Sequence, residues 1–153
     1  MKLQLSLPTL SIPTLAALLF GAFTALAAAS LHLVLSRFAL EAQIDEWILI
    51  VSPALLSMVI ALIVYRRAGD RIRKIGQSLS RGLVVGVLTW IGFAALSTWM
   101  WCIPTLYAEC LRHTLMISGA LGGGQLLVGA LCAAAITGRV IGSRAARIEA
   151  DKG

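Results

Sequence analysis

The sequence predicts an all-α membrane protein in which four transmembrane helices form a single bundle. Hydrophobic residues make up 59% of the 153 residues and charged residues only 13%, whereas a soluble domain has about 45–50% apolar and about 25% charged residues. The mean hydropathy of the chain is +0.89. The charges are also clustered, so that four long stretches of the chain carry none.

Each uncharged stretch is long enough to cross a bilayer, because ~20 helical residues cover a hydrocarbon core of ~30 Å. The predicted spans cover about residues 14–35, 47–65, 82–101 and 114–138. Helices satisfy their backbone polar groups within the segment, and the alternating pattern of a membrane β-barrel is absent. We therefore predict one membrane domain over residues 1–153, with a tail at 1–13, a loop at 66–81 and a tail at 139–153.

Lys and Arg residues mark one side of the predicted membrane domain. The 66–81 loop and the two tails hold 11 of the 13 basic residues, and the opposite loops hold only Arg37 and Arg112. Basic residues in short loops stay in the cytoplasm. This asymmetry predicts a multi-pass protein of the bacterial inner membrane with both termini in the cytoplasm.

The basic loop is expected to contact anionic lipid headgroups, at about 1 kcal/mol for each basic residue near the surface. Its basic residues are Arg66, Arg67, Arg71, Arg73, Lys74 and Arg81. Ile72, Ile75 and Leu79 would share one face of a short helix lying on the membrane, whereas Gly69 and Gly76 favour a solvated connector. Topology accounts for the net charge of +6, so nucleic acid is not an expected partner.

Small residues recur every four positions in three of the spans. They are Ala17, Gly21, Ala25 and Ala29 in the first, Gly82 and Gly86 in the third, and Gly119, Gly123, Ala130, Ala134 and Gly138 in the fourth. Residues four apart share a helix face, and small side chains there let two helices approach closely in lipid. These faces predict either packing within the bundle or contact with another membrane protein or a second copy.

One polar residue, Gln125, follows the glycines at 122–124 at mid-depth in the fourth span. Consecutive glycines could break the helix and expose backbone groups, as in transporters built from inverted repeats. The first half of the chain has no matching element. A hydrogen bond from Gln125 to a neighbouring helix is therefore the favoured interpretation.

Cys102 and Cys110 bracket the outer loop between the third and fourth spans, and an oxidising periplasm would favour a disulfide between them. Four spans with outer cysteines resemble, in topology, the membrane oxidoreductases that pass electrons from disulfides to quinones. Those proteins also carry a Cys-x-x-Cys motif in the first outer loop, and residues 37–46 contain no cysteine. The likeness is therefore limited to topology.

His32 and His113 both lie toward the predicted outer face. Histidines on two helices could hold a haem iron, and they could equally be interfacial polar groups. The predicted spans contain no Asp, Glu, Lys or Arg, which proton relays and most ion pathways need at depth. No nucleophile–base pair or ligand cluster can be assembled. We therefore predict that the protein is not an enzyme and has no catalytic residue, metal site or cofactor.

These observations predict a non-enzymatic inner-membrane protein that acts by helix–helix association with a partner. It would be an accessory subunit of a membrane assembly or an immunity-type protein, since its size and layout are similar to those of membrane-embedded immunity proteins against pore-forming toxins. Two alternatives stay open. One is a periplasm-facing redox protein that uses Cys102 and Cys110 or a haem on His32 and His113, and the other is an oligomeric pore or carrier.

Overall fold

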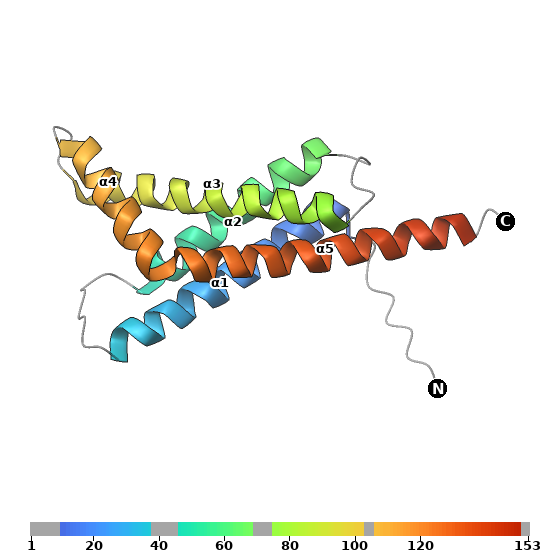
Figure 1. Cartoon of the computed structure of the whole chain (residues 1–153), viewed down its shortest axis with the longest axis horizontal. Helices are drawn as coiled ribbons and strands as arrows, with labels where there is room; N and C mark the ends of the chain where they lie inside the picture. The colour runs from blue at the N-terminus through green and yellow to red at the C-terminus, as the bar shows by residue number, and fades with distance from the viewer. Residues whose placement is uncertain (1–9, 38–45, 69–74, 103–105, 151–153) are drawn as a thin grey trace.

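The computed structural model describes residues 10–37, 46–68, 75–102 and 106–150, and its regular structure is helical throughout (Figure 1). The elements are α1 (Ile12–Arg37), α2 (Glu46–Ala68), α3 (Ile75–Trp101), α4 (Tyr107–Ser118), the π-helical segment η3 (Gly119–Gly123) and α5 (Gly124–Ala150). Four helices contain a stretch long and apolar enough to cross a membrane. These stretches are Ile12–Leu33, Ile50–Arg67, Gly76–Met100 and Gly124–Arg144. They indicate a multi-pass membrane protein, as the sequence predicts.

The start of α1 is set by its own residues. The backbone N–H of Thr14 donates to the Ser11 hydroxyl at 3.4 Å, and the N–H of Leu15 donates to the Ser11 carbonyl at 2.9 Å. A serine in this position caps a helix by accepting an otherwise unpaired N–H. Pro13 follows in the first turn, where its missing N–H removes no helical hydrogen bond.

The helices α2 and α3 extend further at their basic ends than the sequence predicts. Helix α2 continues to Ala68 and α3 begins at Ile75, so residues 75–81 lengthen α3 instead of forming a separate surface helix or connector. Arg81 therefore lies inside the apolar stretch of α3. Long basic side chains allow this, because their charged heads can reach the headgroups while their stems stay among apolar atoms. Three predicted headgroup contacts, Arg71, Arg73 and Lys74, lie outside the described residues, as do residues 1–9 of the predicted tail.

The fourth span also differs from its predicted limits. The sequence predicts one segment over 114–138, whereas the helix begins at Tyr107, passes through η3 and has its apolar stretch at Gly124–Arg144. Figure 1 shows that the chain changes direction where α4 meets α5. A π-helical turn widens the backbone locally, and four of the six residues at 119–124 are glycine, which relaxes the steric limits on the backbone there.

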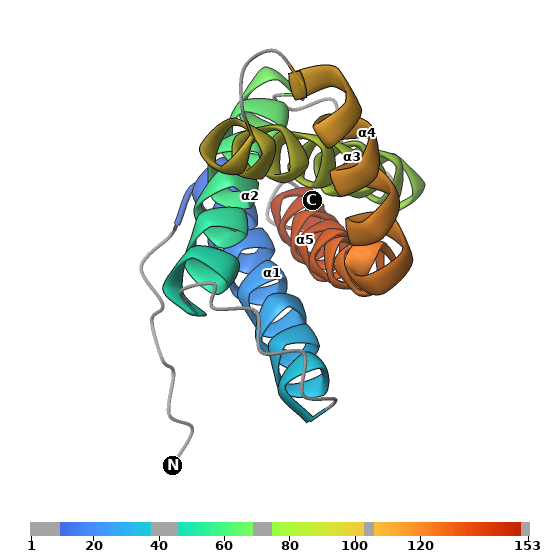
Figure 2. The same cartoon turned by 90° about the vertical axis from the view of Figure 1, so that its left-hand side faces the viewer.

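The four long helices contact one another in a ring. Helix α1 packs against α2 and α5, and α3 packs against the same two helices, while α4 lies on α3 (Figure 2). The start of α1 and the end of α5 lie at the same end of the molecule (Figure 1), where the guanidinium of Arg144 donates to the Leu10 carbonyl at 3.0 Å. We call this the termini end and the opposite end the α4 end.

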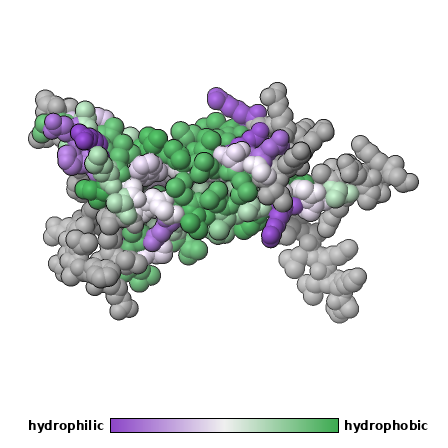
Figure 3. All heavy atoms as spheres, viewed as in Figure 1, coloured by the Kyte–Doolittle hydropathy of each residue, from purple (hydrophilic) through white to green (hydrophobic). Residues whose placement is uncertain are grey.

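The surface carries an apolar middle between two hydrophilic ends. Figure 3 shows hydrophobic residues over the central part of the molecule and hydrophilic residues toward both ends. Large apolar side chains point outward there, among them Leu26, Leu33 and Val128, each at least 60% exposed. Such a surface is unfavourable in water and suits the hydrocarbon core of a bilayer.

Hydroxyl groups link the helices inside this apolar shell. The Thr24 hydroxyl of α1 donates to the Ser57 hydroxyl of α2 at 3.0 Å, and both side chains are buried. The Ser78 hydroxyl of α3 donates to the Ala134 carbonyl of α5 at 2.8 Å and lies 3.1 Å from the Tyr65 hydroxyl of α2. Because Ser78 uses its only hydrogen on Ala134, the Tyr65 hydroxyl donates toward Ser78. Three helices therefore meet at one serine.

Candidate functional site: a groove between α1 and α5

The small residues chosen from the sequence mostly face other helices of the same chain. A Cβ atom on Gly21 would overlap the side chain of Met58, and one on Gly82 would overlap the Ala134 methyl group. A Cβ on Gly86 would lie 3.0 Å from the Cβ of Ala130. Close packing of α1 on α2, and of α3 on α5, therefore depends on these glycines.

The remaining small residues are distributed between the interior and its edges. Ala17, Gly123, Ala130, Ala134 and Gly138 are buried, and Ala25, Ala29 and Gly119 are half-buried. Gly119 faces the Trp90 ring, whose indole N–H donates to the Ser118 hydroxyl at 3.0 Å. Little of the predicted small-residue surface is thus left open for a partner.

An open groove of about 510 Å³ runs between α1 and α5 on the apolar surface. Its lining residues are Phe23, Leu26, Ala27 and Ser30 from α1 and Gly124, Gln125, Val128, Gly129 and Cys132 from α5. The floor is set at Gly129, where an added Cβ would lie 3.2 Å from the Phe23 carbonyl oxygen. The two helix backbones therefore come close at Gly129.

The groove contains one polar pair. The Ser30 hydroxyl lies 3.2 Å from the Gln125 side-chain oxygen and 2.8 Å from the Ala27 carbonyl oxygen, so its single hydrogen is divided between them. Within the described residues the other end of the Gln125 amide has no partner. Turning the amide around does not change this, because Ser30 reaches only one of its two ends.

The unpaired amide lies toward the α4 end of the apolar surface. Gln125 is one helical turn, or ~6 Å, from Gly129, and Gly129 contacts Phe23 near the middle of the apolar stretch of α1. Gln125 is also exposed. It is the second residue of the apolar stretch of α5. An exposed amide on a lipid-facing apolar surface is costly unless another molecule supplies a partner.

A separate apolar cavity of about 70 Å³ lies between the helices toward the α4 end. It is lined by Ala27, Ala28, Leu31, His32, Pro53, Phe93, Gly122 and Leu126. Ala27 borders both the cavity and the groove. The π-helical turn contributes Gly122, where a Cβ would lie 2.7 Å from a methyl carbon of Leu31.

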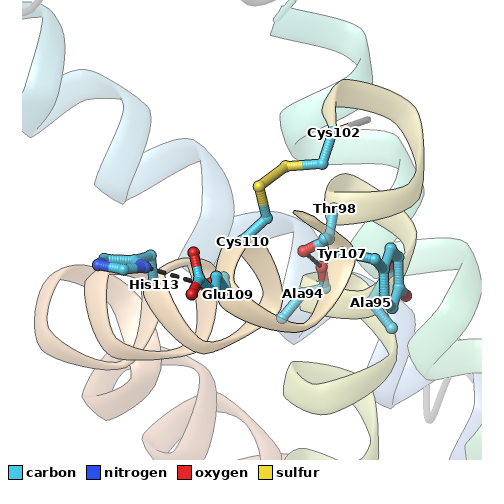
Figure 4. Close-up of a disulfide and its surroundings, with 8 residues drawn as sticks. All are labelled: Ala94, Ala95, Thr98, Cys102, Tyr107, Glu109, Cys110 and His113. Carbon is cyan, nitrogen blue, oxygen red and sulfur yellow. Dashed lines mark hydrogen bonds between the residues drawn. A yellow bond between two sulfur atoms is a disulfide. The ribbon is translucent and has the colours of Figure 1, made fainter. Parts of the chain in front are cut away.

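At the α4 end, Cys102 and Cys110 form a disulfide between the end of α3 and α4 (Figure 4). Their Cα atoms are 6.5 Å apart, within the range that disulfides span. The Tyr107 hydroxyl adds a second tie by donating to the Ala95 carbonyl of α3 at 3.1 Å. The sequence predicts this pairing, and the structure places the two cysteines at bonding distance. The third cysteine, Cys132, is exposed in the groove.

The two histidines do not share a site. His32 lines the apolar cavity, whereas His113 is exposed on α4 with its Nδ1 atom 2.8 Å from the Glu109 carbonyl oxygen (Figure 4). His113 does not line the cavity. Within the described part of the chain, no group of three or more His, Cys, Asp or Glu side chains could hold a metal ion.

Comparison with known proteins adds no family. No protein-family model matches the chain, and no curated protein or solved structure is significantly similar to it.

Proposed function

We propose that this chain is a non-enzymatic protein of the bacterial inner membrane that binds a transmembrane helix of another membrane protein in the groove between α1 and α5. The exposed Gln125 amide carries this proposal, because it offers an unpaired hydrogen-bonding group inside an apolar groove toward the α4 end. A helix with a polar side chain or an accessible carbonyl at that level would complete the pair.

The shape of the groove supports a helix as the occupant. Small residues let two helix backbones approach in lipid, where dispersion contacts and hydrogen bonds drive association. Gly124 lines the groove and has no atom within 4 Å of an added Cβ. Its neighbours Leu26 and Val128 supply exposed apolar walls at 67% and 62% exposure.

Charge supports the orientation that we propose, a four-helix bundle with both termini in the cytoplasm. The 66–81 segment and the two tails hold 11 of the 13 basic residues, and the positive-inside rule assigns such segments to the cytoplasm. An accessory subunit of a membrane assembly and an immunity-type protein are the two roles that fit a binding groove inside the bilayer.

Site-specific photo-crosslinking in native membranes tests the groove. A photoreactive residue in place of Leu26 should crosslink a second protein, and Gly124→Leu should abolish that crosslink by filling the groove. Gly142→Leu is the matched control, because Gly142 also has no atom within 4 Å of an added Cβ and does not line the groove.

The product of this experiment identifies the occupant. A crosslinked band of one chain plus a partner supports the proposal. A band at twice the mass of this chain would replace the partner with a second copy. The absence of any protein crosslink, or a crosslink that Gly124→Leu leaves intact, would show that no helix occupies the groove.

A periplasm-facing redox function is the second candidate, and the Cys102–Cys110 disulfide is the observation that favours it. Replacing both cysteines with alanine tests whether binding in the groove depends on the disulfide. Under the groove proposal the crosslink at Leu26 persists in this variant, since the disulfide joins α3 and α4 and does not line the groove.

A further inference from the structure

The side chain of Arg81 is the one described arginine with a buried nitrogen that lacks a hydrogen-bond partner. The residue is half-buried, and its Nη1 atom is buried without an acceptor among the described residues. By contrast, Arg144 donates to the Leu10 carbonyl, and Arg66, Arg67 and Arg139 are exposed. An ionised donor in this situation is stabilised by an anion, and no described residue accepts a hydrogen bond from this atom.

The polar groups nearest to Arg81 along α3 are already engaged. Ser78 lies three residues before Arg81, so the two side chains share a helix face. The Ser78 hydroxyl donates to Ala134, and the Tyr65 hydroxyl is directed at Ser78. The charge of Arg81 also lies within electrostatic range of the Tyr65 hydroxyl. Neither hydroxyl accepts a hydrogen bond from Arg81, and its Nη1 atom stays unpaired among the described residues.

The depth of Arg81 matches the headgroup region. It lies five residues inside the apolar stretch that begins at Gly76, which corresponds to ~7.5 Å along the helix. Because the Nη1 atom is buried among protein atoms, the side chain must turn outward to meet a lipid phosphate, and its length allows it to reach the phosphates from that depth. Its planar guanidinium forms two parallel hydrogen bonds with a phosphate, which favours this anion over a monodentate ligand.

An apolar stripe continues from Arg81 toward the middle of the bilayer. Val84, Leu88 and Ile91 follow at spacings of three, seven and ten residues and so share its helix face. They are 48%, 45% and 44% exposed. A charged head followed by an apolar stripe is complementary to a phospholipid and not to a free phosphate ion.

We propose that Arg81 holds the phosphate of one anionic phospholipid in the leaflet at the termini end, with an acyl chain along Val84, Leu88 and Ile91. The site is separate from the groove between α1 and α5, since none of these residues lines it. It is also distinct from general contact of the basic loop with headgroups, because it binds one lipid in a fixed place.

Native mass spectrometry of the full chain, stripped of lipid in detergent, tests the site. Phosphatidylglycerol should bind one to one and about tenfold more tightly than phosphatidylcholine, whose choline cation offsets the phosphate charge. Inorganic phosphate at the same concentration should not displace the lipid. Equal binding of the two lipids would overturn the proposal, and displacement by phosphate would assign the site to a free anion instead.

Two arginine variants and one control locate the binding. Arg81→Gln should weaken phosphatidylglycerol binding about tenfold, and Arg81→Lys should weaken it less because it keeps the charge but loses the bidentate geometry. Arg139→Gln, an exposed arginine on α5, should change binding by less than about twofold.

The variants also separate the lipid from a protein ligand. If Arg81→Gln fails to fold, Arg81→Lys and the comparison of lipids on the unchanged chain decide the question. Unaltered phosphatidylglycerol binding by a folded Arg81→Gln or Arg81→Lys protein would sink the assignment. The assignment would also be wrong if a protein co-purified only when Arg81 is present and lipid binding did not depend on Arg81. That result would indicate a carboxylate of a partner protein as the anion.

Discussion

Gly82 of α3 lies directly against Ala134 of α5, so that even a methyl group on Gly82 would overlap the Ala134 side chain. The Ala130 carbonyl oxygen would lie 3.1 Å from the same added Cβ. Both obstacles belong to one helix, and one of them is backbone, so α5 would have to move as a unit to make room. The spacing between α3 and α5 is therefore set by the absence of a side chain at Gly82.

Gly82→Ala should lower the free energy of unfolding by about 1–3 kcal/mol, the usual effect of inserting a methyl group into a packed interior. Gly142→Ala is the matched control, because its Cβ meets no atom within 4 Å. Alanine is the better helix former by about 1 kcal/mol, so this control should be slightly stabilised. Reversible unfolding in mixed detergent micelles measures both values. A Gly82→Ala protein as stable as the unchanged chain would show that the contact between α3 and α5 accommodates a methyl group at Gly82.

Ser78→Ala should destabilise the protein by about 1 kcal/mol, because hydrogen bonds between membrane helices average ~0.6 kcal/mol and Ser78 joins three helices. Ser80→Ala is the control on the same helix, since the exposed Ser80 hydroxyl donates only to the Gln77 carbonyl of its own turn. The same unfolding assay should rank the two variants in this order. Equal effects of the two substitutions would show that the hydrogen bonds of Ser78 between helices add no stability.

Thiol labelling without reductant should modify neither Cys102 nor Cys110, because the two form a disulfide. Cys132 is exposed and should be labelled in the unfolded protein under the same conditions, which provides an internal control. A bridge that closes so short a loop should stabilise the protein by about 2.5 kcal/mol. Three labelled cysteines in an unreduced sample would rule out the bridge.

Reporter fusions should place positions near Lys74 and Lys152 in the cytoplasm and positions near Asp45 and Glu109 outside. The reason is the concentration of 11 of the 13 basic residues in the 66–81 segment and the two tails, which favours their retention in the cytoplasm. A periplasmic reporter signal at Lys74 would reverse the proposed orientation.

The four apolar helices and the pairing of Cys102 with Cys110 are predictable from the amino-acid order alone. Both follow from local properties, because membrane spans are set by runs of apolar residues and two cysteines 8 positions apart in one predicted outer loop favour a disulfide in an oxidising compartment. The clustering of Lys and Arg is likewise a property of the amino-acid order alone. None of these features depends on which helix lies beside which.

Tertiary structure decides what the small and polar residues do. Gly21 packs against α2 and Gly82 packs against α5 of the same chain. The spacing of small residues along one helix does not reveal which helix packs against them. Gln125 meets Ser30 across 95 positions of sequence. The π-helical turn at Gly119–Gly123 depends on the local backbone geometry. Arg81 belongs to α3 because the helix continues past the end of the uncharged run. Hydropathy alone predicts neither feature. The open groove and the unpaired arginine nitrogen therefore emerge only when the helices are placed together.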